Sequence, residues 1–159
     1  MLRYFFILII GFPFVSFSQT EDSYKPPNAV VLSASHGEDL MKQCSRPSPE
    51  AKKFWDITKT DSDVLEEYFN KLLAMKSKEG NRITNLRNYA YQYLGITIGN
   101  KKYIYINAFQ LKADKSPDEV YPSWKTSPVK PCDGGTMFWG ALFDMQTKEF
   151  SQLAFNGGK

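Results

Sequence analysis

Two runs rich in tyrosine, isoleucine and phenylalanine, residues 89–98 and 101–111, meet at a glycine–asparagine dipeptide at positions 99–100. Glycine followed by asparagine between two such runs is typical of a type II′ turn joining antiparallel strands. A two-residue loop also fixes the register, because Ile98 then has to pair with Lys101. The segment therefore predicts a long β-hairpin on which the rest of the chain has to pack.

Both faces of this hairpin carry apolar or aromatic side chains. One face holds Leu94, Ile96, Ile98, Tyr103, Tyr105 and Phe109, and the other holds Tyr91, Tyr93, Ile104 and Ile106. A hairpin with one solvated face would alternate apolar and polar residues. We therefore expect both faces to be covered, one by a helix and the other by the N-terminal segment, a loop or a partner.

Residues 61–76 predict the main helix. Leu65 begins an apolar stripe at i, i+3, i+4 and i+7, which is the spacing of one helix face. Thr60 can cap the first turn, because Asp63 follows three residues later in a capping-box arrangement. We expect the helix to end before Gly80.

A second hairpin is predicted from residues 137–143 and 149–155. The expected register places aromatic residues opposite each other, Phe143 with Phe150 and Phe138 with Phe155. The simplest fold with this element order is an α+β domain in which one main helix packs on a four-stranded antiparallel sheet of two hairpins. This outline resembles the cystatin-like arrangement in the order of its elements alone.

The N-terminus has the three parts of a secretory signal peptide: Arg3, a short apolar run over 4–17 and small residues at its end. We expect residues 1–18 to be removed and the mature protein to be periplasmic or extracellular, with no stable membrane insertion. Residues 19–50 then form an extended lead-in, and residues 51–157 form a single domain. Short strands are expected at 29–32 and 53–57, with a helical turn at 38–44.

The chain has two cysteines, Cys44 and Cys132. In an exported protein an even number of cysteines indicates a disulfide, and this one would close a long loop. The alternative is a reactive Cys132, which would need a lowered pKa from a nearby cation such as Lys130. The glycines after Asp133 either form a tight turn into the second hairpin or cradle an anion.

Charge and composition exclude several classes of function. The mature chain, without the single charge of Arg3, carries 19 basic and 17 acidic residues, too close to balance for nucleic-acid binding. His36 is the only histidine, and no cysteine or histidine spacing fits a zinc site. We predict no catalytic residues, no metal and no cofactor.

Four residues are the candidate binding residues: Trp124, Gln92, Asn107 and Asp133. Trp124 lies in a long connection, residues 112–136, where it either anchors a ligand or folds back over the sheet. The hairpin register places Gln92 opposite Asn107 on an apolar face, so we expect the two amides to bond to each other or to the loop. If they lie open in a groove, they become ligand contacts.

Several short motifs resemble those of a group of small exported bacterial proteins without assigned activity. They are Tyr89-x-x-Gln92-Tyr93-x-Gly95-Ile96, Ile104-Tyr105-Ile106-Asn107-Ala108-Phe109, Cys132-Asp133-Gly134-Gly135-x-x-Phe138-Trp139-Gly140 and Phe155-Asn156-Gly157. The likeness covers residues 54–157. The resemblance implies membership of this group, but it implies no catalytic or binding activity.

The sequence leaves three hypotheses about function. The first is a soluble, non-catalytic module that binds or inhibits a protein or peptide, with another envelope or secreted protein as its partner. The second is a small envelope hydrolase with a site near Asp133, Asn107 and Gln92. The third is a structural component of the envelope.

Overall fold

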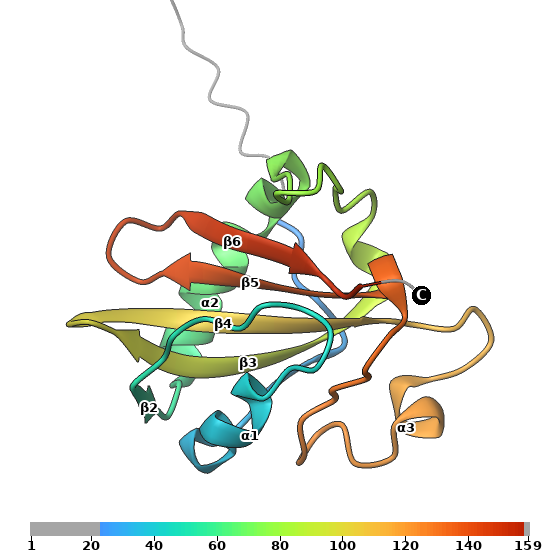
Figure 1. Cartoon of the computed structure of the whole chain (residues 1–159), viewed down its shortest axis with the longest axis horizontal. Helices are drawn as coiled ribbons and strands as arrows, with labels where there is room; N and C mark the ends of the chain where they lie inside the picture. Colours follow the sequence, from blue (N-terminus) through green and yellow to red (C-terminus); the bar gives the residue numbers. More distant parts are fainter. Residues whose placement is uncertain (1–22, 158–159) are drawn as a thin grey trace, which may run out of the picture.

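The computed structural model describes residues 23–157. The predicted signal peptide, residues 1–18, lies outside them. A six-stranded sheet forms the centre of the molecule, with the order β1-β3-β4-β5-β6 and with β2 paired to β3 beside β1 (Figure 1). The strands are β1 (Ala29–Val31), β2 (Lys53–Trp55), β3 (Tyr89–Ile98), β4 (Lys101–Gln110), β5 (Phe138–Asp144) and β6 (Phe150–Phe155).

The helices of the described residues are short. The α-helices are α1 (Gly37–Met41), α2 (Lys59–Glu67) and α3 (Pro117–Val120), and the 3₁₀ segments are η1 (Ala34–His36), η2 (Phe69–Ala74), η3 (Leu86–Asn88) and η4 (Gly135–Met137). No helix within residues 23–157 is long and apolar enough to cross a membrane.

The predicted fold class, one main helix on a four-stranded antiparallel sheet with a cystatin-like outline, is wrong. The sheet is mixed, because β1 runs parallel to β3, and two additional short strands share the edge of β3. β1 covers Tyr91–Tyr93, and β2 covers Gly95–Thr97. Backbone groups along a buried edge need partners, and the N-terminal segment supplies them.

The predicted helix over residues 61–76 is also corrected. α2 ends at Glu67, and the chain continues as the tighter η2. The cap is Thr58, whose hydroxyl accepts the N–H of Asp61 while the Asp61 carboxylate accepts the N–H of Thr58. Thr58 and Thr60 both begin a Thr-x-x-Asp pattern, and the earlier one is used because Thr58 still has extended backbone.

The first hairpin has the predicted register. Ile98 pairs with Lys101 and Gln92 pairs with Asn107. Gly99 has a φ of +60°, as the first central position of a type II′ turn requires.

The second hairpin agrees with its prediction only near the turn. Phe143 pairs with Phe150, and their ring centroids lie 4.9 Å apart. Phe155 pairs with Trp139 and not with Phe138, because a β-bulge near Gln152, which has a φ of +52°, adds one residue to β6. The extra residue lets Leu153 and Phe155 face the same side of the sheet as Phe150.

Both faces of the sheet are covered, as expected. α2 lies behind the sheet in Figure 1, and α2 and η2 together bury Leu65, Phe69 and Leu72 against it. The later part of the N-terminal segment, with α1, lies in front of the sheet, and Leu32 and Leu40 pack on that face. The connection between β4 and β5 covers the remainder of that face with apolar side chains, including Trp124 and Val129.

Candidate functional site

The amide pair Gln92 and Asn107 is fully buried at the centre of the front face. Asn107 Nδ2 donates to Gln92 Oε1 at 2.9 Å, so the two amides bond to each other as predicted. The other bonds of Gln92 and one further bond of Asn107 go to the backbone of the long connection. Gln92 donates to the carbonyls of Trp124 and Ser127 and accepts the N–H of Val129, and Asn107 donates to the carbonyl of Val129.

A buried arginine that the sequence analysis did not single out extends this network. Arg46 is only 6% exposed. Its Nε and Nη2 donate to the Tyr105 hydroxyl at 3.2 and 3.1 Å, its Nη2 also donates to Asn107 Oδ1, and its Nη1 donates to Asn156 Oδ1 at 2.7 Å. None of the ion pairs within residues 23–157 involves Arg46. The charge is therefore held by neutral side-chain oxygens.

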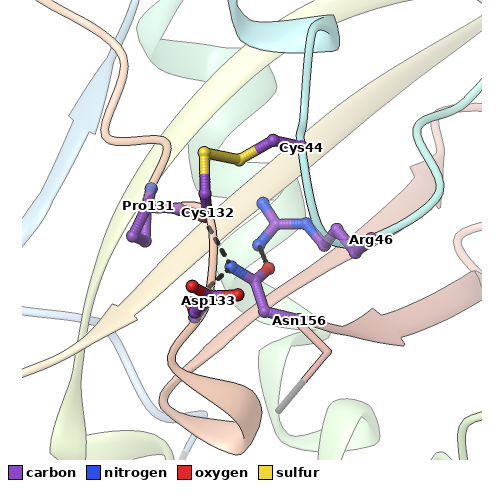
Figure 2. Close-up of a disulfide and its surroundings, with 6 residues drawn as sticks. All are labelled: Cys44, Arg46, Pro131, Cys132, Asp133 and Asn156. Carbon is purple, nitrogen blue, oxygen red and sulfur yellow. Dashed lines mark hydrogen bonds between the residues drawn. A yellow bond between two sulfur atoms is a disulfide. The ribbon is translucent and has the colours of Figure 1, made fainter. Parts of the chain in front are cut away.

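Asn156 connects this arginine to the disulfide region (Figure 2). Its side-chain Nδ2 donates to the carbonyl of Pro131 at 2.9 Å and to that of Asp133 at 3.1 Å. Between these residues lies Cys132, which forms the predicted disulfide with Cys44. The alternative of a reactive Cys132 thiol is therefore wrong.

The glycines after Asp133 form a tight turn into β5. Gly134 has a φ of +101°, and a Cβ there would lie 2.4 Å from the Phe138 ring. The N–H of Gly135 donates to the carbonyl of Gly157. This donor is therefore used within the turn, which matches the tight-turn interpretation. The Asp133 residue is exposed on the surface.

Trp124 folds back onto the sheet and is 3% exposed. Its ring packs edge-on against Phe109 with centroids 5.8 Å apart, and its Nε1 donates to Asp118 at 3.2 Å. Hydrogen bonds from Lys125 and then from Trp124 hold the pKa of the Asp118 carboxyl below its ordinary value of 3.8. The indole is thus a packing residue of the long connection in this structure.

A groove of about 600 Å³ lies beside the network, over the front of the sheet. Four neighbouring strands each contribute a floor residue, namely Ile98, Tyr105, Gly140 and Ala154. Residues 47–50 form one wall, and residues 75–79 with the edge of β6 form the other. Crossing four strands takes about 14 Å, which is the length of about four extended residues.

The hollow exists because small residues lie where β5 and β6 cross the groove. A Cβ at Gly140 would lie 2.4 Å from the Tyr105 hydroxyl, so only glycine lets that ring lie across β5 and reach Arg46. Ala154 adds little volume beside it. The floor of the groove and the Arg46 network therefore depend on the same tyrosine.

Charges of both signs surround the groove, with Glu50 on one wall and Lys76, Lys78 and Glu79 on the other. The Ser48 hydroxyl oxygen is buried in the first wall and has no hydrogen-bond partner among the described residues. This wall is fixed on its N-terminal side by Arg46 and by the disulfide of Cys44. The groove is thus bordered by a wall that is rigidly attached to the rest of the molecule.

The structure brings some of the predicted binding residues together. Gln92 and Asn107 are in direct contact, and the backbone of Trp124 joins them. The carbonyl of Asp133 accepts a hydrogen bond from Asn156, which the Arg46 network includes. Arg46 and the polar role of Tyr105 were not predicted from the sequence, although the position of Arg46 two residues after Cys44 indicates that it lies near Cys132.

No group of three or more histidine, cysteine or acidic side chains within residues 23–157 has an arrangement that could hold a metal ion. Comparison of the chain with protein-family models, with curated proteins and with solved structures finds no significant match. The function has to be inferred from the geometry of the chain itself.

Proposed function

We propose that this protein is an exported, non-catalytic module that binds an extended segment of another envelope or secreted protein in the groove over β3 to β6. The observation that carries the proposal is the groove itself, which crosses four strands and has a wall attached to a buried arginine and a disulfide. Elongated hollows of several hundred cubic ångströms on a rigid scaffold are typical of ligand sites.

Rigidity of the groove favours binding, because little order has to be gained when a ligand enters. Tyr105 in the floor is held by two bonds from Arg46. The wall at 47–50 follows directly after Arg46 in the chain, and the N–H of Lys52 bonds to Thr97 at its other end. Both ends of the wall are therefore fixed to the sheet.

The lining favours a peptide over a sugar. Sugars and flat ligands bind on exposed aromatic faces, whereas the only aromatic residue lining this groove, Tyr105, is buried in its floor. The charges of both signs at the rim suit the polar groups and mixed side chains of a peptide.

Export is supported by the disulfide, because such bonds persist in oxidising compartments. The hydrolase alternative has less support, since Gln92 and Asn107 are buried and bonded to the backbone of the long connection. No specific observation favours a structural role in the envelope.

The test is selection of binders from a displayed library of random seven-residue peptides. We expect selected peptides to bind the wild-type protein and to lose about tenfold or more in affinity with Ala154→Trp, which fills the groove floor. Ala113→Trp is the matched control, because Ala113 is exposed in the long connection. Thermal unfolding checks that both variants remain folded. Peptides that bind both variants equally, or a library without groove-dependent binders, would contradict the proposal.

A further inference from the structure

A second, smaller cleft opens between β1 and α2, at the far edge of the sheet from β6. Its volume is about 240 Å³, below the range of about 300–1,000 Å³ common for small-molecule pockets. Residues 29–31 form one side, Asp63 and Glu66 are on the other, and Tyr93 lines the space between them. A cleft of this size suits one side chain.

Two carboxylates, Asp63 and Glu66, and one cation, Lys59, line the cleft. Asp63 is already paired with Lys59, whose side chain is 85% exposed. Glu66 takes part in none of the ion pairs of the described chain. Burial, followed by the charge of Asp63, raises the pKa of Glu66 above 4.5, while Lys59, Lys25 and Tyr93 act in the opposite direction. A cation entering the cleft would relieve this penalty.

The buried hydroxyl of Tyr93 is a second feature of the cleft. The residue is 1% exposed, and its hydroxyl completes no hydrogen bond of ordinary geometry with residues 23–157. Its interaction with the Glu66 carboxylate is the polar contact it has. A buried hydroxyl normally has a partner, and a donor placed in the cleft would supply one.

The strand beside the cleft has an open edge. Asn28 and Leu32 direct their backbone groups to β3, through bonds with Tyr91 and Tyr93. Backbone groups alternate along a strand, so those of Ala29 and Val31 point away from the sheet. β1 is an edge strand of the sheet, and no other described strand pairs with its outer side. Val31 is 40% exposed. An open edge of this kind can accept another strand.

We propose that the cleft between β1 and α2 binds the ammonium or guanidinium group of a lysine or arginine side chain, carried by an extended chain that pairs with the open edge of β1. The cation lies between Glu66 and Asp63 and donates to the Tyr93 hydroxyl. The chain bonds to the outward groups of Ala29 and Val31. This site is separate from the groove over β3 to β6, and neither proposal depends on the other.

The test uses a fluorescein-labelled peptide, acetyl-Val-Thr-Lys-Val-Thr-amide, with fluorescence polarisation as the readout. The matched peptide has norleucine in place of lysine, which keeps the length of the side chain and removes its charge. We expect Glu66→Gln to weaken binding of the lysine peptide about tenfold, the effect of losing one charge-assisted hydrogen bond. Glu67→Gln, at the exposed neighbouring position, should leave it unchanged.

Two further arms test the Tyr93 contact and the strand pairing. Tyr93→Phe keeps the ring and should weaken binding of the lysine peptide alone. Val31→Pro removes an outward N–H from an edge strand, where proline is tolerated, and should weaken both peptides. Equal binding of the lysine and norleucine peptides, or unchanged binding to Glu66→Gln, would overturn the cation site. Binding of acetyl-lysine amide as tight as that of the peptide would overturn the strand pairing.

Discussion

Arg46 places a positive charge in the interior among neutral oxygens. Removing a charge from water is costly, and here hydrogen bonds to Tyr105, Asn107 and Asn156 offset that cost. These three residues belong to distant parts of the chain. One side chain therefore connects the lead-in, the central hairpin and the C-terminal end.

Arg46→Met should lower the free energy of unfolding by about 2–4 kcal/mol, because three buried acceptors lose their donor. Urea denaturation of the purified protein measures the change. Lys52→Met, at an exposed position of the same segment, is the control and should change stability by less than about 0.5 kcal/mol. Equal stability of Arg46→Met and the wild type would contradict this expectation. It would mean that the free-energy cost of burying the guanidinium equals the stabilisation from its hydrogen bonds.

Gly140→Ala should destabilise the protein by about 1–3 kcal/mol, because the new methyl group overlaps the Tyr105 hydroxyl. The loss should be smaller when Tyr105 is already phenylalanine, since the closest clash is then absent. Thermal unfolding of the two single variants and the double variant measures this coupling. Gly157→Ala is the control, because its Cβ would have an ordinary contact of 3.5 Å with Ser45.

The elements were predictable from sequence where a local signal determines them. The Gly99-Asn100 turn determines the whole register of β3 and β4, down to the contact between Gln92 and Asn107. The three-residue strands β1 and β2 were placed correctly in the chain, but their pairing with β3 was not foreseen. Such short strands have no pattern that encodes a partner, a direction or a register.

The same contrast explains the errors in the second hairpin and in the main helix. Phe143 and Phe150 flank the turn and pair as predicted, whereas the bulge near Gln152 has no glycine or other sequence signal to mark it. In α2 two overlapping capping patterns were available, and the chosen one depends on where β2 ends. The candidate groove was not predictable, because four strands and two loops form it.

Thr58→Ala should lower the stability by about 1 kcal/mol, because it removes the hydroxyl that caps α2. Thr60→Ala is a matched control of the same chemistry at an exposed position two residues later. Its effect should be within about 0.5 kcal/mol of zero. Urea denaturation compares the two, and a larger loss from Thr60→Ala would contradict the assigned cap.

At the scale of the whole molecule, the disulfide closes a loop between residues 88 positions apart. Replacing both Cys44 and Cys132 with alanine should lower the free energy of unfolding by up to about 4–5 kcal/mol, the chain-entropy value for a loop of this length. Hydrogen exchange should increase most in residues 112–136, whose far end the bond holds. Unchanged exchange in that connection would show that the Gln92 and Asn107 contacts hold it alone.

The dependence of stability on pH should have two opposing parts. The hydrogen bond with Thr58 lowers the pKa of Asp61 below 3.8. The stabilisation from Asp61 is therefore present above pH 3.8 and is lost as the pH falls through the pKa of Asp61 in the folded protein. Burial and then the charge of Asp63 raise the pKa of Glu66. The stabilisation from Glu66 is therefore present below pH 4.5 and is lost as the pH rises through the pKa of Glu66 in the folded protein.

Glu66→Gln should therefore raise the urea midpoint at neutral pH and leave it unchanged at strongly acidic pH, where the wild-type carboxyl is already protonated. Glu67→Gln is the control at the exposed neighbouring position. Urea midpoints measured from acidic to neutral pH compare the variants. A lower midpoint for Glu66→Gln at neutral pH would reverse the sign assigned to this group.

The sequence separation between Arg46 and Asn156 has a consequence for the order of events in biosynthesis. The ribosome makes Arg46 early, but the last acceptor for its guanidinium emerges more than a hundred residues later. Until then the nascent chain cannot complete the environment that shelters this charge. The network around Arg46 can be completed only after Asn156 has been made, and chains that terminate before Asn156 retain an arginine that still requires solvent.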